Sequence, residues 1–549
     1  MRFNWKHLVI FLIIILGAVI VRFYQLDKIP PGLIIDEASE GYNAFSILHT
    51  GKDRYGQSFP TLFRSFGSFQ APLYTYLSVI PIYFWGNSIF SIHFISAVSG
   101  VVLVITTFIL LIDFEKRRRI GLSAVAAFLV AISPWAVFFS RIGTEASLGV
   151  TLFALSFLLF YLSLKRLWLF PVATFVLGLS THAYYSERLI GVLFLIGFIL
   201  LFKKTLLLRK KLLIAGLMLF ALTQIPHLLI ANSGAFTRRL SQVDYFSNQF
   251  FQVNSGDLRF IPFGRFLFII REFLSQYLAY FSPNNLFFNP DPQGARSMPD
   301  LSVFYSWMII PFVFGLRSFT KNHLSPLVRI LILLTVLAPI PASLTKDPFC
   351  TIRTLVFFWS ITIIIAFGVN YLLNIFLSFK SKALIIIIIV SISLIQLYLA
   401  YFVLLKYERS ENYGFSYLEL LKKIEIDKDR KFVVDSTREL GTGIRFAFIK
   451  KYDPLTLQKA LGSRIVGQYY SNFEYDEPYI LDNIEARPVI WREDPCKKQV
   501  LVGDIIAISN DQVKEHYLRF LFDIKNLAGD ITLKAYITNP DAKCNLVPL

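Results

Sequence analysis

The sequence predicts a polytopic α-helical membrane protein that ends in a small α/β domain. Its 549 residues are 55% hydrophobic and only 17% charged, whereas soluble domains average about 25% charged residues. Apolar runs recur up to residue 405, and a membrane-spanning helix needs about 20 such residues. We therefore expect a transmembrane domain at 1–405 and a domain outside the membrane at 406–549.

The net charge of +18 lies in the hydrophobic part of the chain. Residues 406–549 hold 22 basic and 22 acidic residues, which leaves 33 of the 55 basic and 15 of the 37 acidic residues before them. A nucleic-acid-binding protein with this charge would be rich in charged residues, and this chain is poor in them. The composition excludes a disordered chain and argues against a soluble basic protein.

We expect about eleven membrane-spanning helices. They lie near residues 7–24, 90–112, 120–139, 146–164, 167–182, 188–202, 212–231, 303–316, 325–343, 354–377 and 383–405. No small-residue cleavage site follows the first segment, so we interpret it as a span and not as a signal peptide.

Short loops rich in Lys and Arg set the orientation, because such loops stay in the cytoplasm. With the N-terminus in the cytoplasm, one face carries Lys116–Arg119, Lys165, Arg166, Lys203, Lys204, Arg209–Lys211, Arg317, Lys321, Lys380 and Lys382. This orientation requires the segment 72–86 to lie on the membrane as an interfacial helix. It leaves two long outer loops, 24–89 and 232–302, and we expect a second interfacial helix at 264–281.

The C-terminal domain lies outside the membrane in this topology. Its pattern predicts helices near 417–424 and 443–451 and strands near 431–436 and 500–509. Of the three cysteines, Cys496 and Cys544 share this domain and can form one disulfide, whereas Cys350 cannot pair in the same way. No Cys/His spacing typical of a metal site is present.

The outer loop after the first span holds two adjacent carboxylates, Asp36 and Glu37, behind a Pro-Pro-Gly turn. One interpretation is the start of a solvated surface helix. The other is catalytic, because a carboxylate can take the proton of an acceptor hydroxyl. Arg141 and Glu145, at the outer end of the third span, are either a helix-end ion pair or part of a site.

Two further outer loops carry charged residues at the membrane edge. The first holds His182, Tyr184, Glu187 and Arg188; an arginine at this depth needs a partner or an anion, and Glu187 is the nearest candidate partner. His182 alone is more typical of a structural residue. The second loop holds Lys346 and Arg353, which either extend to the interface or hold a phosphate.

The order of these motifs resembles that of membrane glycosyltransferases of the GT-C class. It is most similar to bacterial relatives of protein O-mannosyltransferases and of the lipid A aminoarabinose transferase. The motifs that carry the resemblance are 31–37 with Tyr42, 50–56, 69–74, 140–145 and 341–353. They cover the chain up to about residue 405, so the predicted fold is GT-C-like.

The resemblance implies a cell-envelope enzyme of the bacterial plasma membrane. Its donor is a polyprenyl-phosphate sugar, which it transfers with inversion to a glycan, lipid or protein acceptor. Asp36 takes the position of the general base, with Glu37 orienting it. The predicted substrate-binding residues are Tyr42, Arg141, Glu145, His182, Tyr184, Arg188, Lys346 and Arg353. No cofactor is firmly predicted; a divalent cation held by Asp36 and Glu145 is possible in the class, although the second outer loop lacks an Asp-x-Asp motif.

Two other functions remain open from the sequence. A transporter or flippase for lipid-linked sugars would favour internal repeats and charges at mid-membrane, and neither is apparent. A non-catalytic member of the class would use the outer domain to bind a partner.

Overall fold

The computed structural model describes residues 5–115, 121–375, 379–439, 441–463, 465–475 and 478–544. The basic loop Lys116–Arg119, which supports the predicted orientation, lies outside the described residues. The chain forms two compact units. The first consists of Met1–Leu26, Ala71–Tyr74 and His93–Phe402, and the second of Asp27–Gln70, Thr75–Ile92 and Val403–Leu549. The second unit therefore joins most of the first outer loop to the C-terminal residues.

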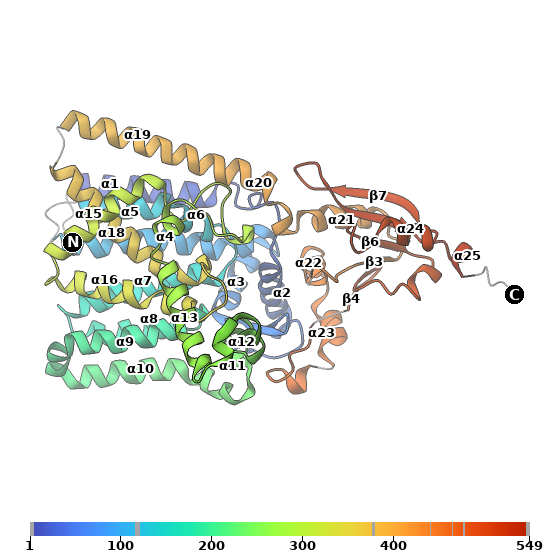
Figure 1. Cartoon of the computed structure of the whole chain (residues 1–549), viewed down its shortest axis with the longest axis horizontal. Coiled ribbons are helices and arrows are strands. Elements are labelled where there is room, and N and C mark those ends of the chain that lie inside the picture. The colour runs from blue at the N-terminus through green and yellow to red at the C-terminus, as the bar shows by residue number, and fades with distance from the viewer. Residues whose placement is uncertain are drawn as a thin grey trace. The chain divides into compact units, whose positions relative to one another are not determined.

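The first unit is a bundle of long apolar helices that run side by side (Figure 1). The helices are α1 (Trp5–Phe23), α4 (Ile89–Phe114), α5 (Gly121–Ile132), α6 (Pro134–Phe139), α7 (Glu145–Ser163), α8 (Leu169–Ser180), α9 (Tyr185–Leu206), α10 (Lys210–Leu229), α15 (Ile309–Lys321), α16 (Pro326–Leu337), α17 (Ile340–Ser343), α18 (Leu355–Ile375) and α19 (Phe379–Leu397). A π-helical segment, Tyr398–Leu404, follows α19.

Within the described residues, each predicted span overlaps one of these helices or a consecutive pair. The span expected at 303–316 is displaced, because α15 begins at Ile309 and ends at Lys321. Six segments of the described residues are long and apolar enough to cross a membrane, and one of them, Tyr185–Ser233, includes both α9 and α10. Shorter apolar helices lie at Leu8–Phe23, Gly121–Ile132 and Leu169–Ser180. The chain is a multi-span membrane protein, and the number eleven stays a prediction.

One predicted span is divided by a proline. The span expected at 120–139 consists of α5 and α6, which meet at Ser133. Pro134 is the first residue of α6; it lacks an N–H group, and its ring disfavours helical geometry in the residue before it.

Short helices form the second outer loop of the first unit. They are α11 (Ala235–Val243), α12 (Asn248–Asn254), α13 (Gly264–Ala279) and α14 (Pro283–Phe287). The predicted helix at 264–281 is thus present as α13, and the segment 72–86 forms α3 (Pro72–Trp85). Both helices expose large apolar side chains, including Tyr83 and Phe84 in α3 and Phe266 and Leu278 in α13. Their location at the membrane surface stays a prediction.

The second unit contains the helix that carries Asp36. In the outer loop, α2 (Ile35–Thr50) precedes a hairpin of β1 (Phe63–Ser65) and β2 (Ser68–Gln70). Among the C-terminal residues, the helices are α20 (Leu405–Glu408), α21 (Phe415–Ile426), α22 (Thr442–Ile449), α23 (Pro454–Gly462), α24 (Asn510–Glu515) and α25 (Pro540–Lys543).

A six-stranded mixed sheet organises the C-terminal domain, in the order β4 (Tyr479–Leu481), β5 (Ile484–Ala486), β3 (Phe432–Val434), β6 (Val500–Gly503), β8 (Ile531–Ile537), β7 (Arg519–Lys525). The strands β5, β3 and β6 are parallel, and the outer pairs are antiparallel. The helices and the first strand predicted in this domain coincide with α21, α22 and β3, so the predicted α/β class is confirmed. The strand predicted at 500–509 is too long: β6 ends at Gly503, because Asp504 Oδ1 accepts from the N–H groups of Ile506 and Ala507 and forms a turn.

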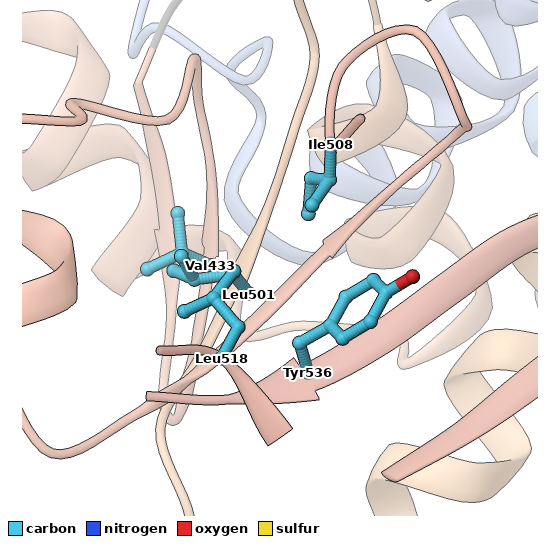
Figure 2. Packing of buried hydrophobic residues seen from close by; sticks show 5 residues of the cluster. All are labelled: Val433, Leu501, Ile508, Leu518 and Tyr536. Carbon is cyan, nitrogen blue, oxygen red and sulfur yellow. The ribbon is translucent and has the colours of Figure 1, made fainter. Parts of the chain in front are cut away.

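A compact apolar cluster covers one face of this sheet (Figure 2). Leu501 in β6 pairs with Val433 in β3 on one side and with Tyr536 in β8 on the other. Because side chains alternate along a strand, these register partners point to the same face, where Ile508 and Leu518 join them. The predicted disulfide, Cys496–Cys544, is also present in this domain, and Cys350 is a buried free thiol.

Candidate functional site

The two adjacent carboxylates lie in the first turn of α2, where the helix macrodipole stabilises negative charge. Glu37 is fully buried, and its Oε2 accepts a hydrogen bond from the backbone N–H of Ile34 at 2.8 Å. Glu37 therefore closes the start of the helix. Asp36 is half-buried.

A chain of hydrogen bonds leads to the Asp36 carboxylate. The Nε2 of Gln70 donates to Asp36 Oδ1 at 3.3 Å and to the Asp36 carbonyl at 3.2 Å. The hydroxyl of Ser39 donates to Gln70 Oε1 at 2.9 Å, and the buried guanidinium of Arg54 donates to Ser39 Oγ at 2.5 Å. Arg54 thus acts on Asp36 through two intermediate side chains, and this chain fixes the orientation of Gln70.

Tyr42 lies on the same helix and is fully buried. Its hydroxyl donates to the carbonyl of Tyr452 at 2.8 Å. Burial raises the pKa of Tyr42 above its ordinary value, so the hydroxyl stays protonated as a donor. These contacts describe a packing residue, and a role in substrate binding stays a prediction.

In the first unit, Arg141 closes the end of α1. Its Nη1 donates to the carbonyls of Val21 (2.6 Å) and Arg22 (2.9 Å), and its Nη2 donates to those of Tyr24 (2.8 Å) and Gln25 (3.4 Å). The last carbonyls of a helix have no partner within the helix, and Arg141 supplies one. Its predicted contact with substrate is not tested by these bonds.

Glu145 and Arg353 both lie within electrostatic reach of the Tyr184 hydroxyl. Burial is the main reason that the pKa of Tyr184 is raised; the charges of Glu145 and Glu187 raise it further, and that of Arg353 opposes the shift. Gly149 permits this arrangement, because a Cβ there would lie 2.9 Å from Tyr184 Cβ and 3.0 Å from Glu187 Oε1. Three predicted site residues from three separate loops therefore share one region of the first unit.

Arg353 forms half of a paired-arginine site. Its Nη1 donates to Thr345 Oγ1 at 2.7 Å and lies 3.4 Å from Asp347 Oδ2. Arg296 reaches the same Asp347 oxygen at 3.2 Å. The two arginine side chains are 15–16% exposed, and the Asp347 side chain is 46% exposed. A single accessible carboxylate oxygen thus holds two arginines, in a geometry suited to an anion.

A buried aspartate fixes the second arginine. Asp291 Oδ1 lies 3.3 Å from Arg296 Nη2, and Asp291 Oδ2 accepts from both the N–H (3.1 Å) and the hydroxyl (2.8 Å) of Thr351. Thr351 begins the short 3₁₀ helix that carries Arg353. One carboxylate therefore sets the spacing of both arginines.

The remaining predicted residues occupy other places in the first unit. His182 stacks on His227 with ring centroids 4.0 Å apart, and its Nε2 lies 2.6 Å from the carbonyl oxygen of Thr223. Arg188 lies over the rings of Tyr185 (4.0 Å) and Phe236 (4.8 Å).

Lys346 lies over a further ring, with its Nζ 5.3 Å from the ring centroid of Phe250. Its backbone N–H donates to the carbonyl of Val243 at 2.8 Å. The loop that precedes Arg353 is therefore tied to the second outer loop of the same unit.

Solved structures match the chain over nearly its whole length. The crystal structure of ArnT from Cupriavidus metallidurans bound to undecaprenyl phosphate has a TM-score of 0.57 and 11% identity, and covers 95% of this chain and 97% of that one. ArnT in the apo state has a TM-score of 0.53 with the same coverage. These are GT-C membrane glycosyltransferases. This chain has the GT-C fold.

A second GT-C structure is also similar. The Archaeoglobus fulgidus oligosaccharyltransferase in the apo form has a TM-score of 0.50 and 13% identity, and covers 98% of this chain and 75% of that one. No protein-family model matches the sequence, and no curated protein matches it. The GT-C resemblance predicted from the motifs is confirmed as a fold.

Sequence reasoning did not single out Arg296 and Asp291 beside Arg353, or Gln70, Ser39 and Arg54 beside Asp36. Arg54 and Gln70 lie inside motifs that carry the resemblance, at 50–56 and 69–74, and that location is a signal for them. Arg296 has no comparable signal, because its contact with Asp347 joins residues 51 positions apart. Within the described ranges, no group of three or more His, Cys, Asp or Glu residues is arranged to hold a metal ion.

Proposed function

We propose that this protein transfers a sugar from a polyprenyl-phosphate donor to an acceptor hydroxyl at the outer face of the plasma membrane. The observation that carries the proposal is the arginine pair Arg296 and Arg353, which already holds one carboxylate oxygen between two guanidinium groups. A phosphate monoester presents more oxygen acceptors of the same kind. The GT-C fold, and the undecaprenyl phosphate bound to ArnT, support a lipid phosphate as the ligand.

The chemistry divides between a base and an anion site. Asp36 takes the proton of the acceptor hydroxyl, and the acceptor oxygen forms a bond to the anomeric carbon with inversion. The bond from that carbon to the phosphate oxygen breaks, and polyprenyl phosphate leaves with the electron pair. A phosphate monoester has a second pKa of about 6, so it leaves without a general acid, and Arg296 and Arg353 stabilise its charge.

The neighbours of the base support this role. Gln70 donates to Asp36 Oδ1 at 3.3 Å, which orients the carboxylate. Glu37 is buried at the helix start, so we assign it to the orientation of Asp36. Glu145 and Tyr184, which share the region of Arg353, are proposed to contact the donor sugar or the acceptor.

Substitution of the proposed base tests the assignment. Membranes that contain the full-length Asp36→Asn variant and their endogenous acceptor are supplied with labelled undecaprenyl-phosphate sugars. We expect release of undecaprenyl phosphate to fall at least about 100-fold, while the melting temperature stays unchanged. Asp27→Asn, a nearby exposed residue, is the control. Wild-type release by Asp36→Asn would exclude this base.

The same preparation separates transfer from lipid transport. A flippase moves labelled lipid across sealed vesicles without releasing undecaprenyl phosphate, whereas a transferase releases it together with a glycosylated product. Mass spectrometry of surface glycans, lipids and proteins from cells that lack the protein then identifies the acceptor.

A further inference from the structure

The segment that leads into α2 is held by the C-terminal domain at one residue. The N–H of Leu33 donates to the carbonyl of Tyr413 at 2.7 Å, and the carbonyl of Leu33 accepts from Arg445 Nε at 3.1 Å. Both backbone polar groups of Leu33 are therefore bound, three residues before Asp36. Leu33, Tyr413 and Arg445 are all at most 2% exposed.

The Arg445 guanidinium is itself fixed on several sides. Its Nη1 forms an ion pair with Glu439 Oε1 at 2.6 Å, and its Cζ lies 5.6 Å from the ring centroid of Tyr417. A Cβ on Gly414 would lie 2.7 Å from Cζ and from Nε. Because the guanidinium has so little room, the position of the Leu33 carbonyl is fixed with it.

The space around the preceding glycine is equally restricted. A Cβ on Gly32 would collide with the carbonyl oxygen of Tyr413. The backbone at residue 32 therefore lies too close to the backbone of Tyr413 for any side chain. Further along α2, Gly41 packs against the ring of Phe448, and the Tyr42 hydroxyl bonds to Tyr452. The C-terminal residues therefore hold α2 both before and after Asp36.

We propose that Arg445 is a positioning residue for Asp36. It sets the path of residues 33–35, and thereby the direction in which the Asp36 carboxylate leaves the first turn of α2. The inference rests on the proposed function, in which Asp36 is the base. It assigns the C-terminal domain an indirect part in catalysis, because Arg445 itself touches no reacting atom.

The Arg445→Gln variant of the full-length protein in lipid nanodiscs tests this role. A displacement of about 1 Å at a reacting group can lower a rate about 100-fold, so we expect kcat to fall about 10- to 100-fold. The dissociation constant of undecaprenyl phosphate, measured directly, should change less than about twofold, because the proposed phosphate site does not include α2.

Three further variants keep the inference testable if Arg445→Gln does not fold. Arg445→Lys keeps one donor for the Leu33 carbonyl and should recover part of kcat. Gly32→Ala displaces the same segment without altering Arg445 and should lower kcat in the same range. Arg438→Gln removes an exposed arginine from the loop that precedes α22, paired with Asp504 at 3.1 Å, and should leave kcat unchanged.

The outcomes separate this inference from the proposed function. Amide hydrogen exchange at residues 33–36 should rise in Arg445→Gln and Gly32→Ala and not in Arg438→Gln. If both variants keep wild-type kcat while Asp36→Asn is inactive, the positioning role is wrong and the base assignment stands. A parallel loss of kcat, lipid binding and melting temperature in both variants would also overturn the positioning role. Wild-type activity of Asp36→Asn would contradict the proposed function itself.

Discussion

The carboxylate of Asp53 accepts a hydrogen bond of 2.6 Å from the hydroxyl of Tyr469. Both residues are buried, and 416 positions separate them in the sequence. The other oxygen of Asp53 accepts from the N–H groups of Tyr55 (3.0 Å) and Gln57 (2.9 Å). The bond between Tyr469 and Asp53 is therefore one of those that join the first outer loop and the C-terminal residues in a single compact unit.

The Asp53 carboxyl group should make stability depend on pH. Burial raises its pKa from 3.8 to about 6, although the hydrogen bond from Tyr469 opposes this shift. Between these values the folded protein binds more protons than the unfolded chain, so the free energy of unfolding falls as the pH rises from about 4 to 6. A shift of this size corresponds to about 3 kcal/mol. Between about pH 4 and 6, the melting temperature in detergent should therefore fall less for Asp53→Asn than for wild type. An equal dependence of the melting temperature on pH in both proteins would contradict the prediction.

Loss of the disulfide should destabilise the C-terminal domain. The Cys496–Cys544 bond closes a loop of 48 residues, for which the chain-entropy model gives about 4 kcal/mol. We expect the Cys496→Ser, Cys544→Ser double variant to become sensitive to protease after residue 403, while Cys350→Ser, at the buried free thiol, leaves this domain resistant. In cells, both cysteines should react with thiol reagents only after reduction. Their labelling without reduction would argue against an outer location.

Two glycines allow α15 and α18 to pack with their backbones in contact. A Cβ on Gly368 would collide with the carbonyl of Pro311, and one on Gly315 with the carbonyl of Ile364. Small residues of this kind are typical of close helix contacts in membranes. Gly368→Ala should therefore lower the free energy of unfolding by about 1–3 kcal/mol. Gly17→Ala is the matched control, because a Cβ there meets no atom within 4 Å.

Neutralising Asp347 should strengthen the binding of a lipid phosphate. Asp347 occupies the arginine pair and would repel a second anion, so we expect Asp347→Asn to lower the dissociation constant of undecaprenyl phosphate about 3- to 10-fold. Arg296→Gln should raise it. Asp300→Asn, at an exposed position, should change nothing. Weaker binding by Asp347→Asn would show that its charge supports the arginines more than it competes with phosphate.

Substitution of Arg141 distinguishes a structural role of this residue from a role in substrate binding. Four carbonyls at the end of α1 depend on its guanidinium, so Arg141→Gln should lower the free energy of unfolding by about 3 kcal/mol. The affinity for undecaprenyl phosphate should stay within about twofold of wild type in the protein that folds. A selective loss of affinity at unchanged stability would instead restore the substrate-binding role predicted from the sequence.

The sequence was sufficient for features that depend on local pattern. Apolar runs located the long helices, and one of the two interpretations of Asp36 and Glu37, a helix start, corresponds to the first turn of α2. The solvated surface that this interpretation assumed is wrong, because Glu37, Ser39 and Glu40 are buried. The error in the span predicted at 120–139 also has a local cause. Ser133 and Pro134 divide a predicted span, because apolar composition averages over a proline that interrupts hydrogen bonding.

Contacts between distant residues were not predictable in the same way. Tyr42 bonds to Tyr452, Arg445 to the carbonyl of Leu33, and Arg296 to Asp347, and no periodicity records such pairs. The boundary predicted near residue 405 is a change in composition, whereas the compact units are defined by contacts that bring Asp27–Gln70 together with Val403–Leu549.

The bond between Leu33 and Tyr413 has a consequence for biosynthesis. A ribosome adds about 5–20 residues per second, so the partner of Leu33 is made roughly 20–80 s after Leu33 itself. During that interval α2 is already made, yet the residues that hold its first turn do not exist. The bonds of Leu33 to Tyr413 and Arg445 therefore form late in biosynthesis, and a chain whose translation stops before residue 413 would lack them.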